Sequence, residues 1–263
     1  QLDFYELLKS EQNPFLEASR RYGKTTVILC HVLEELSEHP GWIARWCEPW
    51  KNQALEIVQP EIDKIQLNAP PAKKFIYSTV GSYYQAPNGS RLFLRGINED
   101  KGESARGTAA NVIVADEFGF WRNAGYVRSD VLDPQLLTTN GQFIIASTPP
   151  PNLGHVYYKL KAEAVHKERC VTKIIYDNRG LTQEQIDEAC EKAGGKESAT
   201  WRREYLCEPV ADPERLIIPE FRENLHIVAD DYPYPEHYDA YVGMDLGLDD
   251  WTFVLFAHYD FLR

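Results

Sequence analysis

The sequence predicts an α/β domain with a mainly parallel sheet, and two observations carry that prediction. Short apolar runs of strand-like length alternate along the chain with longer segments of helical periodicity, an order typical of βαβ units. The 263 residues are also 43% hydrophobic and 26% charged, an ordinary globular composition that suffices for one large domain or one domain plus a fragment. Strands are expected at residues 14–18, 42–47, 75–77, 91–94, 111–115, 142–146 and 170–176, and helices at 24–37, 52–67 and 156–168.

Two connections in this order have a pattern of their own. The turn-rich segment 86–90 predicts a hairpin between residues 75–84 and 91–94, and so an antiparallel edge to the sheet. Residues 99–110 are small and charged without periodicity, which predicts a mobile loop.

The C-terminal part of the chain changes character. Residues 182–206 read as two short helices around Gly194 and Gly195, and the segment that follows is rich in proline and acid. The last block alternates like two strands of a hairpin that begins a new unit. Gln1 in place of a methionine indicates a chain trimmed at its start, and the strand-like run before the last residue indicates the same at its end. The expected organisation is a core of residues 1–178, a helical subdomain of 179–210, a linker of 211–237 and a new unit of 238–263.

Composition and charge exclude several classes of protein. No stretch approaches the ~20 consecutive apolar residues that span a bilayer, and the N-terminus lacks a basic-then-apolar signal, so we expect a soluble protein without a membrane partner. The cysteines are five and include no C-x-x-C pair, which argues against a disulfide framework or zinc cluster and favours a reducing cytosol. The net charge of −12 argues against a uniformly basic nucleic-acid binder but leaves room for a local basic face.

The strongest local signal lies at residues 18–25, Ala-Ser-Arg-Arg-Tyr-Gly-Lys-Thr. It matches the phosphate-loop pattern G-x-x-x-x-G-K-[ST], except that Ala18 replaces the first glycine, and it lies between an expected strand and an expected helix. In that context backbone N–H groups and the helix N-terminus would face phosphates, Lys24 would reach the terminal ones and Thr25 the magnesium. The alternative is an ordinary helix start with a solvated Lys24.

A pair of acids follows a second strand. Residues 112–115, Val-Ile-Val-Ala, form a buried-strand run that leads into Asp116 and Glu117. This pattern is expected where one carboxylate holds the Mg²⁺ shell and the next polarises the attacking water. Both motifs follow predicted parallel strands, whose carboxyl ends bind ligands in open α/β sheets. Taken alone, the pair could be a strand cap with two exposed acids.

Hydroxyl groups follow a third strand. Residues 143–146 lead into Ser147, Thr148 and Pro149, which places two hydroxyls beside the strand that carries the acids. Such hydroxyls can sense the γ-phosphate or the attacking water and move a downstream element. Taken alone, the same triplet would simply end a strand.

Further segments complete an ordered set. Ser-Ala-Arg-Gly at 104–107 precedes the acids, Gly-His-Val-Tyr-Tyr-Lys at 154–159 follows the hydroxyls, and Trp-Arg-Arg-Glu-Tyr-Leu-Cys-Glu-Pro and Tyr-Val-Gly-Met-Asp-Leu-Gly stand at 201–209 and 241–247. In order and spacing the set resembles the large terminase subunits of tailed bacteriophages, the ATPases that package DNA into procapsids. The resemblance spans nearly the whole chain. It implies a P-loop NTPase core of the RecA-like (ASCE) type, a small helical lid, and the first strands of a ribonuclease-H-like nuclease.

The resemblance implies a role for most of these residues. Glu117 would be the catalytic base, Asp116 and Thr25 would hold Mg²⁺, and Arg20 would project over the γ-phosphate. Ser147 and Thr148 would couple hydrolysis to movement. The implied ATP contacts are Gln1, which stands where the family has an adenine-reading glutamine, and Ser19, Arg20, Arg21, Tyr22, Gly23, Lys24, Thr25 and Thr26; Arg21 has no matched role of its own.

Arg106 resembles the arginine that some terminases insert into the site of a neighbouring subunit. It lies in a glycine-flanked loop before the acids, and a planar cation that spans developing charge is what an arginine finger requires. The alternative is a generic loop arginine. Arg122 and Arg128 are the other candidates for the finger.

The nuclease part departs from the family. Asp245 sits in a matching motif, where it would be a metal ligand, whereas Asp249, Asp250 and Asp260 have no matched position. Two-metal hydrolysis needs several convergent carboxylates. We therefore expect no DNA cutting from this chain, although a full-length protein would also cut DNA.

The function that the resemblance implies is a viral DNA-packaging motor. Hydrolysis of ATP with Mg²⁺ by a ring of identical subunits, expected to be a pentamer on the portal, would drive double-stranded DNA into the procapsid in the host cytoplasm. The implied partners are DNA, the portal protein and the small terminase subunit. One alternative is a superfamily-2-like helicase, which needs a second RecA-like lobe that the ~50 residues after Pro209 cannot supply. Another is a nucleotide-locked DNA-binding module without turnover, which would have no chemical need of all three of Lys24, Asp116 and Glu117.

Overall fold

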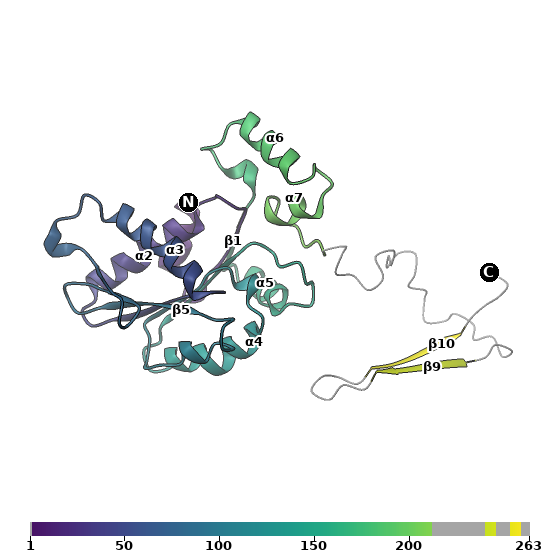
Figure 1. Ribbon diagram of the computed structural model, residues 1–263, viewed down its shortest axis with the longest axis horizontal. Helices are drawn as coiled ribbons and strands as arrows, with labels where there is room; N and C mark the ends of the chain where they lie inside the picture. Colours follow the sequence, from purple (N-terminus) through teal and green to yellow (C-terminus); the bar gives the residue numbers. More distant parts are fainter. Residues whose placement is uncertain (1, 212–239, 246–252, 259–263) are drawn as a thin grey trace. The chain divides into compact units, whose positions relative to one another are not determined.

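The computed structural model describes residues 2–211, 240–245 and 253–258 (Figure 1). The chain divides into two compact units, Gln1–Leu216 and Ile217–Arg263. Each unit is described below by itself. Among the described helices none is both long and apolar enough to cross a bilayer.

A sheet of eight strands, in the order β3-β4-β5-β2-β6-β7-β1-β8, forms the centre of the first unit. The strands from β5 to β8 in that order pair in parallel, as the alternation of apolar runs and helices predicts. β6 and β1 are both neighbours of β7, so the ends of three strands that precede sequence motifs lie side by side. The parallel strands are β1 (Phe15–Ala18), β2 (Ile43–Glu48), β5 (Arg91–Gly96), β6 (Val112–Ala115), β7 (Gln142–Ser147) and β8 (Cys170–Lys173).

The remaining strands, β3 (Ile76–Ser78) and β4 (Tyr83–Gln85), form an antiparallel edge, which confirms the predicted type of edge. The edge contains two antiparallel strand pairs, whereas the sequence predicted one hairpin. The turn at 86–90 joins β4 to β5, and a second turn between Ser78 and Tyr83 adds β3 outside β4. Tyr83 pairs with Phe93 in ring contact and stabilises the register. The strand predicted at residues 170–176 is also shorter than expected: it is β8, which ends at Lys173, and a 3₁₀ turn at Ile175–Asp177 follows it.

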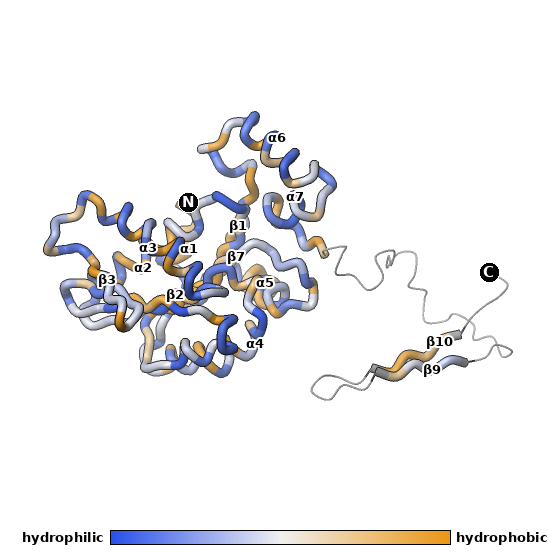
Figure 2. The backbone as a smooth tube through the Cα atoms, viewed as in Figure 1, coloured by the Kyte–Doolittle hydropathy of each residue, from blue (hydrophilic) through white to orange (hydrophobic). Residues whose placement is uncertain are grey.

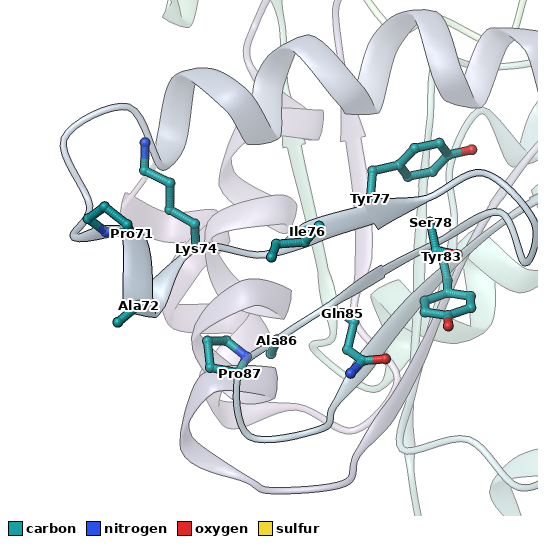
Figure 3. A pocket seen from close by; sticks show the side chains of 10 residues that line it. All are labelled: Pro71, Ala72, Lys74, Ile76, Tyr77, Ser78, Tyr83, Gln85, Ala86 and Pro87. Carbon is teal, nitrogen blue, oxygen red and sulfur yellow. The ribbon is translucent and has the colours of Figure 1, made fainter.

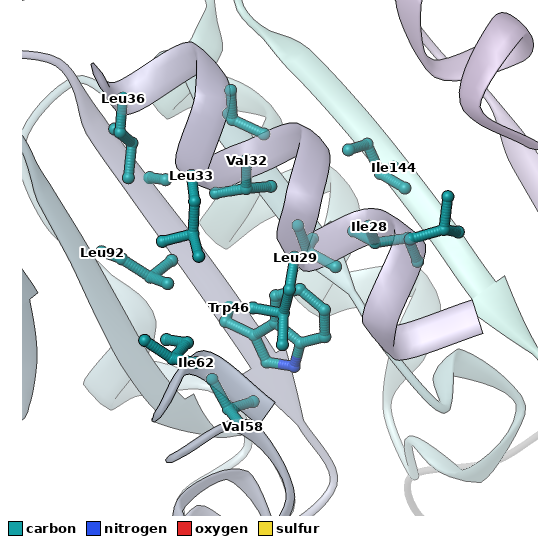
Figure 4. Packing of buried hydrophobic residues seen from close by; sticks show 14 of the residues in the cluster. Ile28, Leu29, Val32, Leu33, Leu36, Trp46, Val58, Ile62, Leu92 and Ile144 are labelled. Atoms are coloured by element: carbon teal, nitrogen blue, oxygen red, sulfur yellow. The ribbon is translucent and has the colours of Figure 1, made fainter. Parts of the chain in front are cut away.

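One face of the sheet is covered by α1 (Leu2–Ser10), α2 (Lys24–Glu38) and α3 (Lys51–Ile65). Figure 4 shows Leu29 and Val32 of α2 packed toward Trp46 and Ile144 of the strands beneath. These four side chains are fully buried. The helix α1 was not expected from the sequence, although Phe4 and Leu8 have the helical spacing and are buried.

The opposite face is covered by α5 (Val156–His166) and by short helical segments between β6 and β7, of which α4 (Ala124–Tyr126) is the first α-helix. Alternate residues of β6 serve the two faces, since Val112 and Val114 join one core and Ile113 and Ala115 the other. Burial on both faces explains why this strand reads as a continuous apolar run.

The two helices around the glycine pair are confirmed as α6 (Gln183–Lys192) and α7 (Ala199–Glu204). Gly194 and Gly195 have φ angles of 94° and 88°, a left-handed conformation that glycine adopts without steric cost. The two helices lie together in Figure 1 and share a small core of Ile175, Ile186, Cys190 and Trp201. This helical segment is called the lid below.

In the second unit the structure describes β9 (Ala240–Asp245) and β10 (Phe253–His258), an antiparallel pair as the alternation predicts. The apolar stretch of β10 is visible in Figure 2. Leu255 and Phe256 are 68% and 73% exposed. A two-stranded hairpin has little core of its own, so the pair does not establish the nuclease fold that the resemblance implies.

Candidate functional site

The predicted motifs meet at the carboxyl edge of the sheet. The phosphate loop follows β1 and the acid pair follows β6, while the hydroxyl pair stands at the end of β7, which lies between the other two strands. Because carboxyl ends of parallel strands share one edge, three sequence-distant segments converge there.

The phosphate loop is shaped by two left-handed residues. Arg21 and Gly23 have φ angles of 63° and 95°. After Gly23 the helix α2 begins at Lys24 without a side-chain cap, which leaves N-terminal N–H groups available to an anion. The Lys24 ammonium donates to the Ala18 carbonyl at 2.8 Å, and the residue is 6% exposed. Lys24 is therefore not the solvated lysine that an ordinary helix start would have.

Thr25 and Asp116, which are far apart in sequence, lie in direct contact. The Thr25 hydroxyl donates to Asp116 Oδ2 at 3.1 Å, and the other oxygen of Asp116 accepts from the Glu117 N–H at 3.0 Å. Asp116 is buried, so it is not an exposed strand cap. Burial raises the pKa of Asp116, opposed by the charge of Lys24. A hydroxyl and a carboxylate oxygen suit Mg²⁺, which takes few protein ligands and completes its shell with water and phosphate oxygens.

Glu117 occupies a left-handed position with φ of 47°, unusual for a residue with a side chain. The turn that it opens is held by the Trp121 indole N–H, which donates to the Asp116 carbonyl at 3.1 Å. Burial raises the pKa of Glu117 to about 7, Lys24 opposes the rise, and the negative charge of Asp116 adds to it. A carboxylate with a pKa near neutrality suits proton transfer.

The hydroxyl pair at the end of β7 contacts both sides of the site. Ser147 Oγ accepts from the Gly119 N–H at 3.0 Å, in the turn that carries Glu117. Thr148 Oγ1 donates to Glu204 of the lid at 3.0 Å. Both hydroxyls are buried, so the triplet does more than end a strand.

A cleft of about 820 Å³ opens beside these groups. Its wall includes Glu117, Trp50 and Arg122, and the Arg122 guanidinium lies 5.3 Å from the Trp50 ring centroid. Thr26 also lines the cleft and donates to Glu61 at 2.9 Å. Of the residues implied as ATP contacts, the cleft is lined by Arg20, Arg21, Tyr22, Gly23, Lys24, Thr25 and Thr26.

Ser19 and Gln1 stand apart from that set. Ser19 does not line the cleft, and its buried hydroxyl has no hydrogen-bond partner among the described residues. Gln1 lies outside the described residues, as does the side chain of Asp245 at the end of β9. Among the described residues, those of this site included, no group of three or more His, Cys, Asp or Glu could hold a metal ion.

The three candidate finger arginines occupy different places. Arg106 does not line the cleft of its own subunit; it donates to Glu103 at 2.6 Å, to the Tyr126 hydroxyl at 2.8 Å and to a carbonyl at 3.0 Å. Arg128 lies over Phe143 and near Asp133. Of the three, Arg122 alone lines the cleft. The loop expected to be mobile contains a 3₁₀ turn at Glu103–Ala105, and Ala105 is buried.

Sequence reasoning missed two buried carboxylates at this site, Glu48 and Glu204. Glu48 ends β2, is fully buried and accepts from the Trp46 indole at 3.0 Å. Burial raises its pKa well above the usual value, and the charge of Asp116 adds to the rise. Glu48 could have been recognised from the sequence, because it is an acid at the carboxyl end of a strand. Glu204 lies in the segment 201–209, which resembles the family, but no role was assigned to it.

A second cavity, of about 460 Å³, lies at the antiparallel edge (Figure 3). Tyr77, Ile76 and Tyr83 line it from β3 and β4, and Lys74 is the charged residue in its wall. It contains none of the motif residues, so it is not the site that the sequence predicts.

Comparison with known proteins identifies the family of this chain. The family described as terminase large subunit, T4-like-virus type, N-terminal, matches residues 15–223, which include the phosphate loop, the acids, the hydroxyls and the lid. The chain belongs to the large terminase subunit family. A search of curated proteins found no match.

Solved structures of other large terminases share the fold. The ATPase domain of the Thermus phage P74-26 large terminase is 18% identical, with a TM-score of 0.61 over 80% of this chain and 98% of that domain. The large terminase of a thermophilic bacteriophage, solved in complex with ADP, is 14% identical, with a TM-score of 0.64 over 99% of this chain. The HK97 bacteriophage large terminase is 18% identical, with a TM-score of 0.57 over 79% of this chain.

These comparisons fix the architecture of the terminase chain. They confirm the predicted α/β sheet with flanking helices of a terminase ATPase domain. The chain covers 64% of the ADP-bound large terminase and 48% of the HK97 protein, so it corresponds to part of those longer chains.

Proposed function

We propose that this terminase chain binds ATP in the 820 Å³ cleft and hydrolyses it with Mg²⁺. The observation that supports this most directly is the contact between Thr25 and Asp116 at 3.1 Å, beside a buried Lys24 and with Glu117 on the cleft wall. A lysine, a hydroxyl and two acids arranged in this way are what P-loop phosphoryl transfer requires.

Each residue has a distinct task in the proposed reaction. Lys24 and the amides at the start of α2 neutralise phosphate charge in the ground state. Thr25 and Asp116 would hold Mg²⁺, which offsets charge on the terminal phosphates when bound. Glu117, with a pKa raised to about 7 by burial, accepts a proton from the attacking water. Arg20 lines the cleft and supplies a second cation.

Membership of the terminase family supports a proposal about the biological setting. We propose that turnover by a ring of identical subunits, a pentamer on the portal protein, moves double-stranded DNA into a procapsid in the host cytoplasm, with the small terminase subunit as a further partner. A nuclease site that includes Asp245 belongs to the longer protein in this proposal.

The test separates binding from chemistry. Lys24→Ala should lose nucleotide binding, because the phosphate loop would lose the buried ammonium that offsets phosphate charge. Glu117→Gln should bind ATP and fail to hydrolyse it, because the amide cannot accept the proton. Nucleotide titrations beside turnover assays, with and without DNA, measure both. Normal hydrolysis by the Glu117 variant would remove it from the role of base, and turnover by neither variant nor wild type would favour a nucleotide-locked module.

A further inference from the structure

Glu204 is the carboxylate that joins the lid to the nucleotide cleft. It is the last residue of α7 and is 4% exposed. The core of the lid is made by other residues, so the burial of Glu204 serves a different contact. A carboxylate is rarely buried unless it is paired.

Its partners come from two of the three motifs. Oε2 of Glu204 accepts from Arg20 Nε at 2.9 Å in the phosphate loop and from Thr148 Oγ1 at 3.0 Å after β7. The backbone carbonyl of Glu204 accepts from the Arg20 N–H at 3.0 Å. Arg20 is thus held by Glu204 at both its main chain and its side chain, while Oε1 of Glu204 lies 3.4 Å from Arg203 Nε.

The hydrogen bond through Nε engages one of the three nitrogens of the Arg20 guanidinium. The terminal amino groups of Arg20 donate no hydrogen bond to any described residue, and the residue lines the cleft. A guanidinium fixed at Nε still presents its two terminal NH₂ groups in a rigid plane, the geometry that matches a phosphate. The ion pair therefore orients Arg20 toward the cleft without occupying the groups that a phosphate needs.

We propose that Glu204 is a positioning residue of the ATPase site: from the lid it orients Arg20 on the terminal phosphate and, through Thr148, ties that orientation to the end of β7. This inference rests on the proposed ATP hydrolysis. Holding a cation in place before the substrate arrives lowers the cost of orienting it in the transition state. The lid would then respond to the phosphate through Arg20.

A purely structural role for Glu204 is the rival explanation. Both explanations predict a loss of thermal stability when Glu204 is replaced, so stability alone does not separate them. They differ in whether the effect on turnover needs Arg20. A positioning residue that acts through Arg20 has little effect on turnover once Arg20 is gone, whereas a structural residue keeps its effect.

The experiment is a double-mutant cycle of Glu204→Gln and Arg20→Ala, with kcat and KM for ATP measured for each protein. We expect Glu204→Gln to lower kcat by about 10-fold to 100-fold, the scale of a misplaced catalytic group, with KM changed by less than about threefold. In the Arg20→Ala background the same substitution should change kcat by less than about twofold. Glu204→Asp, which keeps the charge but withdraws it by one methylene, should act in the same direction and guards against misfolding of the Gln variant.

Glu208 provides the matched control. It pairs with Arg202 in the same geometry, Nε to Oε2 at 2.6 Å, but neither residue lines the cleft. Glu208→Gln should leave kcat unchanged in both backgrounds.

The outcomes distinguish the two proposals. If the Glu204 variants lower kcat by the same factor with and without Arg20, or leave kcat unaltered in an active protein, the positioning role is wrong while ATP hydrolysis stands. If the wild-type chain neither binds nor hydrolyses ATP, both proposals are wrong.

Discussion

Arg106 offers a test of whether each site is completed by its neighbour. The side chain lies away from the cleft of its own subunit and is held by Glu103, Tyr126 and the Asp130 carbonyl. We therefore expect Arg106→Ala to bind ATP nearly as wild type does. If Arg106 acts as a finger on the next subunit, the variant should hydrolyse ATP about 1,000-fold more slowly or worse.

Variants of the residues that Arg106 contacts serve as the control, because they distinguish an arginine finger from an arginine with only a structural role in its own loop. If Arg106 only fastens its loop to α4, then Glu103→Gln and Tyr126→Phe, which remove the partners, should reproduce the loss of turnover. If Arg106 is a finger, these variants should keep most of the turnover, because they leave the guanidinium intact and release it.

Mixing two inactive variants measures action in trans. In an equal mixture of Arg106→Ala and Glu117→Ala subunits, a working interface needs an intact Glu117 on one side and an intact Arg106 on the other. In a head-to-tail ring with random order, about one quarter of the interfaces meet both conditions. Turnover should therefore recover to about a quarter of the wild-type value per subunit, if sites fire independently. A mixture as inactive as each parent, although both join one ring, would refute action in trans and make Arg122, which lines the cleft of its own subunit, the next candidate.

Three further predictions concern other parts of the chain. A Cβ at Gly119 would lie 2.9 Å from Ser147 Oγ, so Gly119→Ala should cost about 1–3 kcal/mol in denaturant unfolding, whereas Gly125→Ala, with nothing within 4 Å, should not destabilise. Burial lowers the pKa of His31, whose Nδ1 has no partner among the described residues, so His31 contributes stability above pH ~6.5 that is lost as pH falls. His31→Gln should reduce the stability difference between pH 7.5 and 5.5 by at most about 1.4 kcal/mol, and an unchanged difference would refute this. Plasmid DNA incubated with the chain and Mn²⁺ or Mg²⁺ should stay intact, and cleavage abolished by Asp245→Ala would contradict that expectation.

The sequence predicted those features that local patterns encode. The runs before the phosphate loop and before the acid pair have the length and apolar content of buried strands. The order of the residues then shows that the loop with Lys24 follows one of these strands and that Asp116 follows the other. That β7 would lie beside the acid-bearing strand also followed from the motif order, and the structure confirms it.

What the sequence could not supply is contact between distant segments. Glu204 meets Arg20 across more than 180 positions, and no periodicity in either segment indicates the other. The position of Arg106 was likewise beyond local patterns, because its partners Tyr126 and Asp130 belong to helical segments between β6 and β7 that the sequence did not predict. The helix α1 was missed for a different reason: it is short, and most of what makes it helical is its packing on α2.

The end of β7 ties these contacts into one arrangement. Ser147 fixes the turn that carries Glu117, and the adjacent Thr148 fixes Glu204, which holds Arg20. Two neighbouring residues therefore contact the group proposed to act on water and the group proposed to act on phosphate. Because packed interiors pass small displacements to their neighbours, a shift of the Glu117 turn on hydrolysis would reach Thr148 and then the lid through a single strand end. Thr148→Val, which keeps the shape and removes the hydroxyl, should therefore leave the Glu117 turn intact and weaken the dependence of lid protection on ATP, measured by hydrogen exchange in α7. If α7 becomes protected by ATP to the same extent in this variant and in the wild type, the lid is reached by another route.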